Sequence, residues 1–304
     1  MNDQQGFPGV AARRFWRWST GDVSVAAYTY VRIAVAVGSI MCFASWAASA
    51  RPGALIRYQP VNTVAPDSSL WWMLLAIGAL GAGLLGAGRF MRPSALATAA
   101  ALQACGGIVA NWAPAALTVS AVALAVALPF TGDAAMTREV PAWPLRFVQL
   151  QLPFGYLLAV LLKLSLTEQW RTLTAFRHMM VHPMNVHRGV HLPLWAGSSF
   201  DLMGLSLEFL AGALLLTSLL SGSNRTRVCG LVLSAALHIG ISLLIPVGLF
   251  FFGVAPLWVA HLRTPPQATR ARTWWWATAW VAVAALMLTG GALLGPGNPF
   301  TLLR

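Results

Sequence analysis

Long apolar stretches recur along the whole 304-residue chain, and they decide what it can fold into. Several approach or exceed the roughly 18 residues that a helix needs to cross the hydrocarbon core of a bilayer. A chain that is 58% hydrophobic and only 9% charged does not form an ordinary soluble domain. The sequence therefore predicts an all-α protein, a polytopic bundle of transmembrane helices. The predicted spans are 24–47, 70–87, 94–112, 115–130, 147–166, 196–220, 228–245, 247–262 and 274–294.

The run 228–262 leaves the number of spans at eight or nine. This run has about 35 apolar residues, whereas a single helix needs about 20 to cross a hydrocarbon core about 30 Å thick. Pro246 and Gly248 are the residues at which it would break, and two spans or a re-entrant hairpin both fit. The sequence predicts a cytoplasmic segment 1–23, a transmembrane domain 24–294 with an outer loop at about 167–195, and a short tail 295–304.

Arginine gives the chain a formal net charge of +12, and its distribution predicts the orientation in the membrane. With a cytoplasmic N-terminus, twelve arginines fall in inner segments and six in outer segments, as the positive-inside rule requires. Because they sit in short loops between apolar runs, they report topology, and nucleic acid is not expected as a partner. The tryptophans near the predicted span ends are assigned to interfacial belts, and these are Trp71, Trp72, Trp112, Trp143, Trp170, Trp195, Trp258 and 274–276.

Lys163 is the only lysine, and it lies inside the apolar run 155–164. An ammonium at membrane depth is costly unless it snorkels to the headgroups, finds a partner or lines a polar cavity. Lysine is also the basic side chain that most readily loses its charge on burial, which is how lysines become general bases. Two interpretations stay open: a functional lysine, or a single lysine near a helix end in an arginine-rich chain.

Four further ionisable residues lie in the spans, and their depths predict which of them pair. Asp201 is in the outer half, as Lys163 is, so an ion pair or a shared hydrogen bond between them is expected. Glu208 follows about two turns later and shares the midplane with His238, while Arg32 would approach both from the inner half. Intramembrane ionisable residues are functional by default, and the alternative is a polar contact that fixes helix packing.

Four histidines in the outer loop are weak candidates for metal ligands. The first pair would share one face if 170–182 were a helix, an arrangement that can bind zinc or copper. Pro183 would end such a helix, and no cysteine or carboxylate lies within the cluster. A solvent-facing cluster without metal is the better interpretation. The four are His178, His182, His187 and His191.

Four segments of the chain occur together in an order that is typical of one family. They are 28–37, 143–164 followed by Trp170, 205–214, and 236–242 followed by 248–252. Together they resemble the bacterial HTTM proteins, the membrane-domain relatives of the vitamin K-dependent gamma-carboxylase. The resemblance spans about residues 25–262 and implies a multi-pass protein of a bacterial inner membrane.

The resemblance also implies roles for particular residues. In the carboxylase, a lysine that matches Lys163 deprotonates vitamin K hydroquinone, so Lys163 is expected to be the general base. His238 matches a histidine that supports this chemistry, and Glu208 matches a recurrent acidic position. With Asp201 and Arg32 as polar support, these residues would act on a quinone or hydroquinone without a metal.

Three functions stay open on the sequence. The leading one is a membrane-embedded enzyme with a lysine base, acting on a lipophilic quinol or a membrane-delivered peptide. The second is a non-catalytic component of a peptide export, maturation or immunity system, with a small secreted or membrane peptide as partner. The third is a proton-coupled transporter, suggested by Glu208 and His238. Phosphate-binding loops and hydrolase motifs are missing, which removes the usual support for ATP-driven transport and for serine or zinc hydrolysis.

Overall fold

The computed structural model describes residues 20–49, 68–109, 113–130, 138–181, 193, 195–244 and 250–262, which are mostly helical. The helices are α2 (Thr29–Ser49), α3 (Ser69–Ala87), α4 (Met91–Val109), α5 (Ala113–Ala127), α6 (Trp143–Leu166), α7 (Glu168–Arg171), α8 (Ala175–Val181), α9 (Ala196–Ser221), α10 (Asn224–Leu244) and α11 (Phe250–Ala260), with a 3-10 turn η1 (Val25–Tyr28) before α2. The predicted span 274–294, the tail 295–304 and most of the segment 1–23 lie outside the described residues.

Four helical stretches are long and apolar enough to cross a membrane, as the sequence predicts for a membrane protein. They are Val25–Ala47, Ser69–Ala87, Trp143–Leu166 and Ala196–Ser221. The outward faces of α6 and α9 carry large apolar side chains, and Phe154, Leu161, Leu202 and Phe209 are each more than half exposed. Apolar surface of this extent is suited to lipid tails and not to water.

A small two-stranded sheet departs from the purely helical prediction. β1 (Asp22–Ser24) pairs antiparallel with β2 (Glu139–Pro141), with Val23 opposite Val140. The Tyr28 hydroxyl donates to the Pro141 carbonyl at 2.6 Å and accepts from the Leu145 backbone N–H at 3.2 Å. The sheet therefore ties the start of α2 to the start of α6, although these segments are far apart in the sequence.

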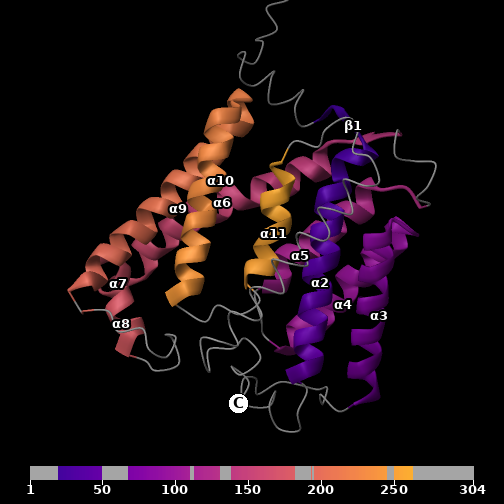
Figure 1. The fold of residues 1–304 in the computed structure, drawn as a ribbon, viewed down its shortest axis with the longest axis horizontal. Coiled ribbons are helices and arrows are strands. Elements are labelled where there is room, and N and C mark those ends of the chain that lie inside the picture. Colours follow the sequence, from indigo (N-terminus) through magenta and orange to yellow (C-terminus); the bar gives the residue numbers. More distant parts are fainter. Residues whose placement is uncertain are drawn as a thin grey trace, which may run out of the picture.

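The helices form two groups that are joined by α6 and α11 (Figure 1). In Figure 1, α9 and α10 stand on one side with α7 and α8 at one end, and α2 and α3 stand on the other side. Helix α6 packs against α9, α5 and α11, and α11 also packs against α2 and α5. A continuous apolar core runs through both groups, and a second cluster around Phe43, Trp46 and Trp71 lies among α2, α3 and α4.

Two glycines let α6, α9 and α10 approach closely. A Cβ atom on Gly212 in α9 would lie 3.0 Å from Leu157 Cγ and 3.1 Å from the Pro153 carbonyl oxygen, both in α6. A Cβ atom on Gly230 in α10 would lie 2.8 Å from Leu215 Cγ in α9. Small residues at such positions bring helix backbones together in membranes. Gly212 and Gly230 thus bring α6, α9 and α10 close enough for side chains of different helices to make contact.

Candidate functional site

Lys163 forms an ion pair with Glu208 across the packed helices α6 and α9. The Lys163 Nζ atom lies 2.5 Å from Glu208 Oε1, and the side chains are 26% and 10% exposed. The ammonium also lies 4.4 Å from the ring centroid of Trp170 in α7, a cation–π distance. Trp170 therefore contacts a candidate site residue, in addition to its predicted place near a span end.

The expected pairing of Lys163 with Asp201 is wrong, and helix geometry gives the reason. Every side chain in an α-helix leans toward the N-terminus of its own helix. Helices α6 and α9 run in opposite directions, because α6 leads into the α7–α8 segment and α9 starts beside α8. Lys163 therefore leans toward the start of α6 and Glu208 toward the start of α9, so the two meet, whereas Asp201 leans away toward α8.

Asp201 holds the α7–α8 segment on α9. Its Oδ1 atom accepts from the Phe176 backbone N–H at 2.8 Å, and the side chain is fully buried. The Ser198 hydroxyl donates to the Leu173 carbonyl at 2.9 Å and makes a second link. Leu173 has a φ of 53°, a left-handed conformation that turns the chain between α7 and α8. Asp201 thus supports the segment that places Trp170 over Lys163.

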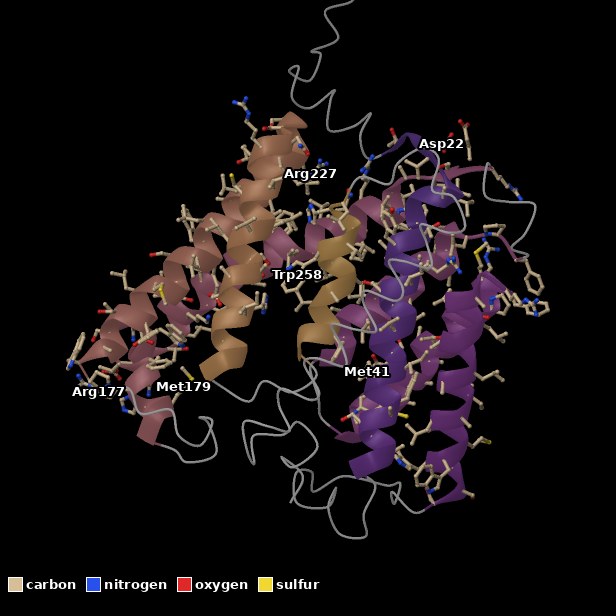
Figure 2. The ribbon with its side chains drawn as sticks, in the orientation of Figure 1. Asp22, Met41, Arg177, Met179, Arg227 and Trp258 are labelled. Carbon is tan, nitrogen blue, oxygen red and sulfur yellow. The ribbon has the colours of Figure 1, made fainter. Side chains whose placement is uncertain are left out.

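His238 lies in a network of four side chains from three helices. The Tyr156 hydroxyl in α6 lies 2.7 Å from His238 Nε2 and also bonds Ser234 Oγ, both in α10. Trp258 Nε1 in α11 donates to Ser234 Oγ at 2.6 Å, and its ring packs edge-on against His238 at 5.3 Å. Figure 2 shows Trp258 extending from α11 toward α10. Its indole is therefore a partner in a polar network between helices, a contact that its predicted place near a span end does not include.

Glu208 and His238 were expected to share the midplane, and in the described residues each has a separate partner on α6: Lys163 for Glu208 and Tyr156 for His238. Tyr156 is seven residues before Lys163, which places both on one face of α6, about 10.5 Å apart along the axis. The Lys163–Glu208 pair and the Tyr156–His238 pair therefore both extend from one face of α6, two turns apart, and we treat them as one polar region.

Arg32 does not approach Glu208 or His238. One guanidinium nitrogen, Nη1, donates to the Leu85 carbonyl at 2.6 Å and to the Gly86 carbonyl at 3.0 Å, at the end of α3. A positive charge is favourable at this end of a helix, where the last carbonyls lack partners. Gly88 closes α3 with a φ of 74°, and a Cβ atom there would lie 2.8 Å from Nη1. The role expected of Arg32 as polar support for the site is replaced by a structural one.

His261, a buried histidine that sequence analysis did not single out, lies after the end of α11 and beside α6. Pro153 has no N–H, so the Gln149 carbonyl one turn earlier has no donor in α6. The His261 ring supplies it, with Nε2 at 2.9 Å from that carbonyl oxygen. Gln149 Nε2 in turn donates to the Ala260 carbonyl at 2.5 Å. A proline inside a predicted span is the signal that could have prompted a search for such a donor.

The predicted metal candidates receive no support from the described residues. His178 lies exposed on α8, and its Nδ1 atom is 2.8 Å from the Thr174 carbonyl oxygen. His182, His187 and His191 lie outside the described residues. Within the part of the chain that is described, no group of three or more histidine, cysteine, aspartate or glutamate side chains could hold a metal ion.

The side chains of this region are suited to holding and moving protons. A lysine and a carboxylate share a short contact, and a phenol and an imidazole share another one deeper on the same face of α6. Sequence analysis missed Tyr156, Ser234 and Trp258, although Tyr156 stands two turns from Lys163. A scan against protein-family models and searches of the curated proteins and of the solved structures find no match to this chain.

Proposed function

We propose that this chain is a membrane-embedded enzyme in which Lys163 and Glu208 exchange protons with a lipophilic quinol or a membrane-delivered peptide. The observation that carries the proposal is the single lysine of the chain, 2.5 Å from a buried glutamate and still 26% exposed. A buried ion pair with a structural role needs its remaining oxygens and protons satisfied by further hydrogen bonds. Glu208 Oε2 is buried and has no partner among the described residues.

The unpartnered oxygen defines what a ligand would do at this site. A hydroxyl or N–H group that reaches Glu208 Oε2 would donate a hydrogen bond to it, and a buried acceptor gains from such a partner. The proton could then pass to the carboxylate, with Lys163 next to it as the compensating charge. A lysine acts as a base only in its neutral form, so proton exchange within this pair is the step that would free it.

The proposal includes the arrangement in the membrane. Eight or nine spans, with the N-terminus in the cytoplasm of a bacterial cell, would place Lys163 in the outer half of the inner membrane. The arginine distribution supports this orientation, and the four long apolar helices support residence in a membrane. A ligand with a lipid tail would then reach Lys163 from the bilayer, between the exposed apolar side chains of α6 and α9.

Kinship with the HTTM proteins is part of the same proposal, and the order of the four similar segments supports it. The carboxylase relatives use a lysine base on a hydroquinone, which makes a quinol the first ligand to test. A peptide glutamate carboxylated in an oxygen-dependent reaction would be the corresponding peptide substrate. The polar region at Lys163 has the residue types that such chemistry needs, a lysine, a carboxylate, a phenol and an imidazole.

The test is to purify the full chain with its native lipids and to identify bound quinone by mass spectrometry. Wild type should retain quinone, and Lys163→Met should lose at least about tenfold, which corresponds to about 1.4 kcal/mol of binding free energy. Lys163→Arg keeps the positive charge but does not give up its proton, so it should retain quinone and lose quinol-dependent oxygen consumption. Arg171→Met on α7 is the matched control, because Arg171 is an exposed cation without a described side-chain contact to Glu208.

Absence of quinone from wild type, together with unimpaired cellular function of Lys163→Met, would contradict the proposal. That pair of results would favour a non-catalytic component of a peptide export, maturation or immunity system instead. A small peptide recovered with both proteins in equal amount would support this second reading. The variants separate the two cases because a scaffold tolerates Lys163→Arg, whereas an enzyme with a lysine base does not.

A further inference from the structure

The donor and acceptor of each hydrogen bond in the network around His238 can be assigned from the groups present. Trp258 Nε1 is a donor only, so the Ser234 oxygen accepts from it. Ser234 then has one hydrogen to give, and Tyr156 is its other partner. Tyr156 likewise has one hydrogen, and its partners are Ser234 and His238.

Only one assignment gives the hydrogens of Trp258, Ser234 and Tyr156 an acceptor each. If Tyr156 donated to Ser234, the serine oxygen would accept twice, and its own hydrogen would have no acceptor in this buried network. A buried donor without a partner costs about 1–3 kcal/mol. Ser234 therefore donates to Tyr156, and Tyr156 donates to His238 Nε2. This order requires His238 to carry its proton on Nδ1 and to present an unprotonated Nε2 to Tyr156.

From this geometry we propose that Tyr156 and His238 form a second proton-accepting unit of the Lys163 site, with Ser234 and Trp258 as positioning residues that hold His238 in the Nδ1–H form. The inference rests on the proposed function, because it assigns to these residues the onward path of a proton that enters at Glu208. Glu208 is the link, since its partner Lys163 lies two turns from Tyr156 on one face of α6. Trp258 acts on the tautomer through the Ser234 and Tyr156 hydroxyl groups, and its ring also packs edge-on against His238.

The transfer is balanced without any change of oxidation state. A proton on Glu208 would move through intervening water to the Tyr156 oxygen, as the Tyr156 O–H proton moves to His238 Nε2. The Glu208 O–H bond and the original Tyr156 O–H bond break, and a new Tyr156 O–H bond and a His238 N–H bond form. Tyr156 ends neutral, Glu208 ends as a carboxylate, and His238 ends as an imidazolium.

The test is nitrogen-15 NMR of the full chain labelled at histidine and held in lipid nanodiscs. The signals of protonated and unprotonated ring nitrogens differ, and His238→Gln identifies which of the six histidines is His238. Wild type should show an unprotonated Nε2 and a protonated Nδ1. Trp258→Phe removes the donor that sets the order, so a mixture of the two tautomers is expected. Trp195→Phe is the control, because Trp195 is 77% exposed and takes no part in the network.

Addition of a quinol without oxygen then tests the transfer itself. His238 Nε2 should gain a proton in wild type and should not do so in Tyr156→Phe, which keeps the ring and removes the hydroxyl. A protonated Nε2 in the unliganded wild type, or an unchanged spectrum in Trp258→Phe, would overturn the inference whether or not a quinol binds. Failure of quinone to copurify would count against the proposed function alone, because the tautomer is measured without ligand.

Discussion

The two helix groups differ in the partners that their polar side chains have among the described residues. In the group of α2 to α5, arginines donate to backbone carbonyls: Arg32 at the end of α3, and Arg92 to the Ala125 carbonyl at 2.9 Å near the end of α5. In the group of α6, α9 and α10, side chains bond side chains of other helices, as in Lys163–Glu208 and Tyr156–His238. Backbone carbonyls at helix ends are available in any helical protein. Convergent titratable side chains depend on particular residues, which is why we assign structure to the first group and chemistry to the second.

The largest effect is expected from separating Lys163 and Glu208. Lys163→Met leaves a buried carboxylate without its cation, and removal of one partner from a buried pair costs about 3 kcal/mol. Glu208→Gln should cost less, because the 26% exposed lysine can turn to water or headgroups. The double variant Lys163→Met/Glu208→Leu should regain most of the loss, since an apolar pair replaces the charges. Reversible unfolding in mixed detergent micelles measures all three, and equal losses in the single and double variants would contradict the pairing.

A smaller loss is expected in the other group from Arg32→Met. The variant keeps most of the apolar bulk and removes two charged hydrogen bonds to the end of α3, worth about 2 kcal/mol in the free energy of unfolding. Quinone retention should stay at the wild-type level, because Arg32 bonds only α3 carbonyls among the described residues. Arg89→Met, at an exposed neighbouring position, is the control. Loss of quinone with unchanged stability would show that the two groups are not separate in function.

The sequence predicts the helical class and the presence of intramembrane charges because these follow from composition and spacing alone. The apolar runs coincide with α2, α3, α6 and α9 to within a few residues at most ends. Residue depth correctly predicted a carboxylate partner for Lys163, but it selected Asp201 where the structure has Glu208. The lean of side chains along antiparallel helices decides between Asp201 and Glu208, and that requires knowing which helices pack together.

Other parts of the site depend on contacts that a sequence pattern does not carry. Trp258 has the same neighbours in sequence as an interfacial tryptophan, and only its place opposite α10 makes it a donor to Ser234. The sequence indicates only that Arg32 is a charge within a span, and the structure shows that it bonds a carbonyl at the end of α3. Tyr156 was within reach of sequence reasoning, because a seven-residue step from Lys163 keeps to one helical face.

Gly212→Ala tests whether close packing of α6 and α9 is needed for the chemistry of the second group. The added methyl would lie 3.0 Å from Leu157 Cγ and 3.1 Å from the Pro153 carbonyl oxygen, so α9 has to shift slightly. We expect a loss of about 1.5 kcal/mol in the free energy of unfolding. Quinol turnover should fall as well, because the Lys163–Glu208 contact spans the same interface. Gly204→Ala is a matched control on the same helix, with no atom within 4 Å of its added Cβ.

The smallest effect is expected near Pro153, where the His261 side chain replaces a missing backbone donor of α6. His261→Phe removes the donor to the Gln149 carbonyl, which Pro153 leaves without a partner in α6, and should cost about 1 kcal/mol. Pro153→Ala restores an N–H one turn after Gln149, so the helix can supply that hydrogen bond itself. The cost of His261→Phe should therefore fall to roughly half in the Pro153→Ala background, a coupling that a double-mutant cycle measures. Equal costs in both backgrounds would mean that His261 stabilises the bundle through packing and not through its contact with the Gln149 carbonyl.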